Sequence, residues 1–137
     1  MWIVLALFSA LFAALTSILA KIGLANVNSN LATAIRTAVV LVMAWFVVFV
    51  SGAQGGLQDI NRRNLLFLVL SGLATGLSWL CYFRALQLGP VSKVIPIDKS
   101  SVVFGMILAF IVFGETLTLK AVIGGALIAI GTFVLIL

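Results

Sequence analysis

Five long apolar runs constrain this chain more than any other feature of its sequence. A helix needs about 20 consecutive apolar residues to cross a bilayer, and 64% of the 137 residues are hydrophobic while only 8% are charged. The runs cover roughly residues 2–20, 31–50, 65–87, 91–113 and 118–137. The sequence therefore predicts an all-α integral membrane protein with five transmembrane helices in a single domain, residues 1–137.

The residue types that most catalytic and metal sites need are missing. The chain has no histidine and one cysteine, Cys81, so neither a Ser-His-Asp arrangement nor a zinc ligand set can be assembled. The net charge of +5 is not gathered into a basic patch outside the membrane. We expect no enzyme, no metal or other cofactor and no nucleic-acid partner, and we expect Cys81 to be a small buried apolar residue.

The short connections and the charges predict a topology. Gly89 and Pro90 separate the third and fourth runs, where glycine permits a turn and proline ends a helical pattern. Five spans place the termini on opposite sides of the membrane. The basic residues then number five on the C-terminal side (Lys21, Arg36, Arg84, Lys93, Lys99) and three on the other (Arg62, Arg63, Lys120). The positive-inside rule favours a cytoplasmic C-terminus, but so small a bias also allows insertion in both orientations.

The fourth run contains a charged pair, Asp98 and Lys99. With a rise of ~1.5 Å per residue from Val91, both lie about 10–12 Å inside the membrane. Each charge costs roughly 2.5–3.5 kcal/mol at the bilayer centre, which nearly cancels the gain from the 13 Val, Ile, Leu and Phe residues of this run. Adjacent helical residues do not face each other, so we expect no ion pair between them. Snorkelling of Lys99 and pairing of Asp98 with Arg84 is the alternative to a functional cavity.

Pro96 interrupts the same run. It leaves the carbonyl of Ser92 without its helical donor and is expected to move Ile95 away from helical geometry. Unbonded backbone at membrane depth is tolerated where it faces protein or a wet cavity, and transporters place binding sites at such breaks. We therefore predict a substrate or coupling site around the charged pair, with Ser101 on the same helix.

The third run carries a stripe of polar residues beside a second stripe in which glycines leave a groove. Hydroxyl groups recur on one helical face (Ser71, Thr75, Ser78, Tyr82), and glycine and aromatic residues form the next (Gly72, Gly76, Trp79, Phe83). Interhelical hydrogen bonding, worth about 0.6 kcal/mol per contact, and GxxxG packing are the alternative interpretation. The predicted substrate or coupling residues here are Thr75, Ser78, Trp79 and Tyr82, joined by Arg36 and Arg84; Gly72 and Gly76 are predicted to be structural.

Small residues also recur on the last run, at Ala121, Gly125, Ala129 and Thr132. Such residues let transmembrane helices approach closely, so we predict a helix contact face with Gly125 as a structural residue. Lys21, at the end of the first run, is expected to anchor at the lipid headgroups.

The segment YFRALQLGPVSKVIPIDKSSVVFGMILAFIVFGETLTLKAVIGGALIAIGTFVLI, Tyr82 to Ile136, resembles the second half of an EamA domain of the drug/metabolite transporter superfamily. It has an aromatic-rich "AL" helix end, a short turn, a proline-led helix, a GE-x-L-T corner (GETLT, 114–118) and a glycine-rich last helix. The likeness extends over all five runs. The resemblance implies that Glu115 is a structural residue of the corner and that Pro96 matches the family's helix 4 proline.

Family members commonly carry two five-helix units in inverted orientation around a central cavity, and this chain has one. The resemblance therefore implies an antiparallel ten-helix homodimer in the prokaryotic cytoplasmic membrane. It implies a secondary transporter of small polar metabolites, amino-acid-like or anionic, that works by alternating access, with its site between helices 1, 3 and 4. A non-transporting membrane subunit is one alternative. Multidrug efflux of lipophilic cations is another, although residues 2–20 lack the carboxylate that it would ordinarily want.

Overall fold

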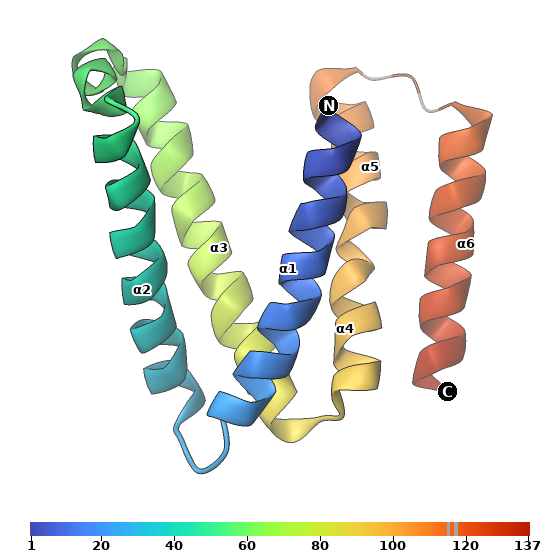
Figure 1. Ribbon diagram of the computed structural model, residues 1–137. Helices are drawn as coiled ribbons and strands as arrows, with labels where there is room; N and C mark the ends of the chain where they lie inside the picture. Colours follow the sequence, from blue (N-terminus) through green and yellow to red (C-terminus); the bar gives the residue numbers. More distant parts are fainter. Residues whose placement is uncertain (115, 117) are drawn as a thin grey trace. The chain divides into compact units, whose positions relative to one another are not determined.

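A computed structural model describes every residue except Glu115 and Leu117, and the regular elements of the described residues are all helices, joined by short connections. The elements are α1 (Trp2–Gly23), α2 (Ser29–Val50), the 3-10 helix η1 (Ala53–Asp59), α3 (Arg62–Leu88), α4 (Val91–Lys99), α5 (Ser101–Phe113) and α6 (Leu119–Ile136) (Figure 1). Five segments of these described residues are long and apolar enough to cross a membrane, and α4 with α5 forms the fourth, Val91–Phe113. The predicted five spans are confirmed. The structural role predicted for Glu115 lies outside the described residues.

Caps determine where several helices begin and end. The Asn28 side chain accepts the N–H of Asn30 at 2.9 Å where α2 begins, and the Thr118 hydroxyl accepts the N–H of Ala121 at 3.2 Å where α6 begins. These bonds satisfy N–H groups that a helix start leaves unpaired. At the other end of a helix, Gly114 terminates α5 with φ of +64°, a left-handed conformation that favours glycine.

The fourth span is interrupted later than predicted. Ile95 and Pro96 both lie within α4, so the prediction that Pro96 displaces Ile95 from helical geometry is wrong. Pro96 is the sixth of the nine residues of α4; it removes the one backbone bond that its N–H would have made and does not end the helix there. The break comes at Ser100, whose N–H is shared between the carbonyls of Pro96 (3.2 Å) and Ile97 (3.1 Å).

The chain forms two compact units, one of residues 1–18 with 88–137 and the other of residues 19–87. In the first unit, α6 packs against α4 and α5. Gly125 of α6 allows the approach, because a Cβ there would lie only 3.1 Å from Cε of Met106. Thr132 is also buried, whereas Ala129 is exposed. The contact face of α6 thus includes Gly125 and Thr132 but not Ala129, so it is narrower than the small residues predicted.

The second unit is built around α2 and α3, which lie side by side (Figure 1). Phe83 and Leu86 of α3 are fully buried. Ser29 and Thr33 of α2 are buried too, and the Thr33 hydroxyl donates to the Ser29 carbonyl at 2.8 Å. The face that α2 presents to the interior of this unit is therefore polar, while that of α3 is apolar.

Candidate functional site

The predicted charged pair lies directly before the break in the fourth span. Nζ of Lys99 is 3.4 Å from Oδ2 of Asp98, so the prediction that these neighbours would not pair is wrong. Adjacent side chains diverge inside a helix, but Lys99 is the last residue of α4 and its long, flexible side chain brings Nζ within reach of the neighbouring carboxylate. The Asp98 side chain is 34% exposed and that of Lys99 is 54% exposed. Ser101, which begins α5, is also exposed. These polar groups are accessible in the single chain.

Two hydrogen bonds hold α4 to α6. The Thr132 hydroxyl donates to the Pro96 carbonyl at 3.3 Å, and Nζ of Lys93 donates to the Ile136 carbonyl at 2.9 Å. The second bond places a cation at the C-terminal end of α6, where the helix dipole favours it. The segment that carries Asp98 is thus positioned by two polar contacts with the last helix.

The hydroxyl stripe of α3 is largely uncovered. Ser71, Thr75 and Ser78 are exposed, and the Thr75 hydroxyl donates back to the Ser71 carbonyl of its own helix at 2.9 Å. A Cβ added at Gly72 or Gly76 would meet no described atom within 4 Å. The notch beside the stripe is therefore open in the described chain.

Arg36 is held between two aromatic rings. Its Cζ lies 4.8 Å from the ring centroid of Trp79 and 4.6 Å from that of Phe83. The two rings are one helical turn apart on α3 and therefore lie on the same face. The Phe83 ring also packs edge-on against that of Tyr82, with their centroids 5.6 Å apart. We call Arg36, Trp79 and Phe83 the arginine clamp.

The rings stabilise a charge that the membrane opposes. An arginine at the centre of a span costs about 2.5–3.5 kcal/mol on insertion scales. Each cation–π contact contributes about 0.5–2 kcal/mol, so two of them offset much of that cost. The five N–H donors of the guanidinium are a separate requirement. Within the described residues, the contacts of Arg36 are to aromatic side chains, and no hydrogen bond or ion pair satisfies these donors.

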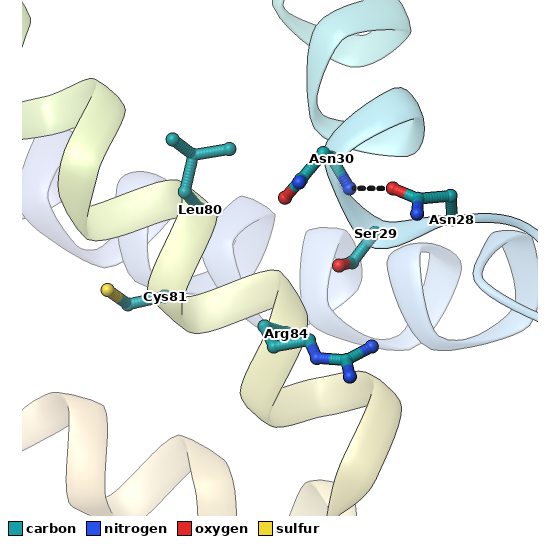
Figure 2. Close-up of a pocket in the computed structure, with 6 residues that line it drawn as sticks. All are labelled: Asn28, Ser29, Asn30, Leu80, Cys81 and Arg84. Atoms are coloured by element: carbon teal, nitrogen blue, oxygen red, sulfur yellow. Dashed lines mark hydrogen bonds between the residues drawn. The ribbon is translucent and has the colours of Figure 1, made fainter.

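A polar cavity opens at the end of the second unit where α2 begins. It has a volume of about 530 Å³. Figure 2 shows its lining, which is Asn28, Ser29, Asn30, Leu80, Cys81 and Arg84. Cys81 is exposed, so the prediction of a buried cysteine is wrong. It lies on a different face of α3 from the buried Phe83 and Leu86.

Hydrogen bonds join the last turn of α1 and the connection that follows it to the end of α3. Nζ of Lys21 donates to the carbonyl of Leu86, and Nε2 of Gln87 donates to the carbonyl of Val27 at 2.8 Å. Nη1 of Arg84 donates to Oε1 of Gln87 at 2.7 Å. The Leu86 carbonyl is among the last four of α3, which have no partner within the helix. Lys21 therefore stabilises the end of α3, a role beyond the expected headgroup anchor.

The predicted substrate and coupling residues are divided between the two units. Arg36 and Trp79 are brought together in the second unit, and Asp98 and Lys99 in the first. The other members of the second unit are Thr75, Ser78, Tyr82 and Arg84, and Ser101 belongs to the first. Phe83 was not predicted as a site residue. The signal for it was its spacing of four residues from Trp79, which puts two rings on one face of α3.

The fold defines a multi-pass α-helical membrane protein with charged groups inside its spans. The whole chain, residues 1–137, matches the EamA-like transporter family, and the protein belongs to that family. It is 48% identical over 134 residues to a protein of Sinorhizobium sp named as an uncharacterized transporter in the cobO 3′ region; the match covers 98% of this chain and 95% of that relative. No solved structure matches the chain. The resemblance to EamA domains is confirmed, and the protein is a membrane transporter.

Proposed function

We propose that the protein is a secondary transporter of small polar metabolites, working by alternating access in the cytoplasmic membrane of a prokaryote. The observation that carries this proposal is the break at Ser100, directly after the accessible pair of Asp98 and Lys99. Interrupted spans expose backbone groups that bind solutes and coupling ions. In this proposal Asp98 carries the coupling proton and Lys99 is its counter-charge. The protein acts by moving solutes and not by catalysis.

We further propose that two copies assemble as an antiparallel homodimer. The exposed Ser71, Thr75 and Ser78 support this assembly, because a hydroxyl within a span gains about 0.6 kcal/mol from a partner on another helix. The open positions Gly72 and Gly76 would let that helix approach closely. The small bias of basic residues, five against three, is compatible with insertion of the chain in both orientations.

Flux measurements test the proposal. Proteoliposomes with an imposed proton gradient would be offered a panel of labelled amino acids, organic acids and lipophilic cations. Asp98→Asn and Lys99→Gln should abolish uptake while the folded protein elutes normally from a sizing column. Asp59→Asn, which changes an exposed acid in η1, is the matched control and should leave uptake unchanged.

Two other outcomes of these experiments would favour the alternative functions. Loss of the folded assembly in both variants would favour a non-transporting subunit, with the polar residues serving as interhelical contacts. Uptake restricted to lipophilic cations would favour multidrug efflux.

The homodimer has a test of its own. Reporters that are active only in the cytoplasm or only outside it would be fused after Leu137. Activity of both reporters is expected, because an antiparallel dimer needs both orientations. Activity of one reporter alone would contradict the antiparallel homodimer.

A further inference from the structure

We propose that the arginine clamp binds the carboxylate group of a small organic solute, with Arg36 as the residue that touches it. This inference deepens the proposed function, on which it rests, because it names the chemical class of the transported solute. Trp79 and Phe83 act as positioning residues that fix the plane of the guanidinium.

The two rings leave the N–H groups at the edge of the Arg36 guanidinium without a hydrogen-bond acceptor. The guanidinium is planar, and Cζ lies over both the Trp79 ring and the Phe83 ring. The rings stabilise the charge but cannot accept the N–H groups along the edge of that plane. A carboxylate matches this edge, because its two oxygens accept two parallel N–H bonds from one guanidinium.

The described residues offer no carboxylate for this role in the second unit. Asp59 belongs to η1, which joins the end of α2 to the start of α3. Arg36 instead lies in the first half of α2, and its two rings lie in the second half of α3. In the first unit, Asp98 already pairs with Lys99. Within its own unit, Arg36 therefore interacts with aromatic side chains, Tyr82 among them, and with no described carboxylate.

A lipid phosphate fits this position less well than a solute. Phe83 and Trp79 precede the end of α3, Leu88, by five and nine residues, which is about 7 and 13 Å along the helix axis. An arginine that snorkels would extend toward the headgroups, whereas this guanidinium is held at the level of the two rings. It is also only partly exposed.

The same unit offers an approach for an anion. The polar cavity at the start of α2 is lined by Ser29 and carries the positive charge of Arg84. Ser29 and Arg36 are seven residues apart and so lie on one face of α2. The charge of Arg84 thus attracts an anionic solute to the unit that contains the clamp.

Binding can be measured through Trp79. A chain carrying Trp2→Phe and Trp45→Phe retains Trp79 as its single tryptophan, and it would be placed in phosphatidylcholine nanodiscs. Acetate, butyrate and benzoate are titrated against their uncharged amides, with excitation at 295 nm and ionic strength held constant with chloride. We expect a saturable change in emission with at least one carboxylate and no change with its amide. A response to both members of every pair, or to neither, overturns the proposal without any substitution at Arg36.

Substitutions then assign the site. Arg36→Gln should weaken binding about tenfold or more, the ratio expected for loss of a hydrogen-bonded charge, and Arg36→Lys should weaken it because a lysine lacks the planar fork. Arg63→Gln removes a charge at the opposite end of α3 and should leave the titration midpoint unchanged. Equal midpoints for Arg36→Gln and Arg63→Gln would overturn the proposal. The proposal would also be overturned if Trp79 emission changed when phosphatidylglycerol replaced phosphatidylcholine in the nanodiscs but did not change with the solute. That result would assign the clamp to lipid.

The nanodisc experiment contains no gradient and measures no flux, so the two proposals can fail separately. Carboxylate binding without uptake of any solute would contradict the transporter and leave the clamp standing. Uptake of solutes that lack a carboxylate, unchanged by Arg36→Gln, would contradict the clamp and leave the transporter standing.

Discussion

Replacing Thr132 by valine should loosen α4 from α6. Valine has the shape of threonine but lacks the hydroxyl that donates to the Pro96 carbonyl at 3.3 Å, and the site is buried. That carbonyl keeps its bond from the N–H of Ser100 at 3.2 Å, so it does not become unpaired. Interhelical hydrogen bonds in membrane proteins average about 0.6 kcal/mol and reach about 1.7. We expect Thr132→Val to lower the free energy of unfolding by an amount within that range.

The assay is unfolding by sodium dodecyl sulfate in mixed micelles, followed by helical circular dichroism. Thr75→Val is the matched control, because the exposed Thr75 hydroxyl bonds only to the Ser71 carbonyl of its own helix among the described residues. That substitution should change stability little. Thr132→Ser keeps a hydroxyl and should recover part of the loss. If Thr132→Val and Thr75→Val gave the same unfolding curve, the contact between α4 and α6 would contribute nothing and the reasoning would be refuted.

Three further predictions concern glycine positions and the single thiol. Gly114→Ala should destabilise the protein by about 1–2 kcal/mol because φ is +64° there. Gly105→Ala, inside α5 with no described atom near its Cβ, should instead stabilise it by up to about 1 kcal/mol. Melting temperatures in detergent that shift in the same direction for both variants would contradict this. Gly125→Leu should lower the melting temperature and Gly125→Ala should barely change it, since a Cβ 3.1 Å from a flexible methionine tip can be accommodated; equal effects would be inconsistent with a close approach. The exposed Cys81 should react faster with an anionic methanethiosulfonate reagent than with a cationic one, because Arg84 lines the same cavity; the preference should disappear in Arg84→Gln.

The membrane spans could be read from the sequence because the bilayer imposes a length on every apolar run. All five predicted spans are present, with ends displaced by up to three residues. The break in the fourth span was expected at Pro96 and is found at Ser100. A proline in the sequence shows only which backbone N–H is absent. The position of the break depends on which N–H groups bond to the carbonyls of Pro96 and the residues after it. Here the N–H of Ser100 bonds to two of them.

The candidate sites could be predicted only in part. Asp98 and Lys99 stood out because charge is rare in an apolar run, but their pairing depends on α4 ending at Lys99, which hydropathy does not report. Arg36 and Trp79 were each singled out, although they are 43 positions apart and their contact arises only when α2 packs on α3. Cys81 was misjudged because small apolar residues can lie on either face of a lipid-exposed helix.

The basic residues of the chain show how Arg36 differs from the other cations inside the spans. Eight lysines and arginines face three acids, so most of them must find partners other than carboxylates. Lys21 and Lys93 donate to carbonyls at the ends of α3 and α6, Arg84 donates to an amide, and Lys99 has the acid beside it. Each of these cations has an oxygen partner, a hydrogen-bond acceptor or a carboxylate. Arg62, Arg63 and Lys120 have no acceptor among the described residues either, but they are exposed and lie in the first two residues of α3 or α6. Arg36 lies further inside its span, where two rings stabilise its charge, and a solute that brings an anionic oxygen would accept its N–H groups.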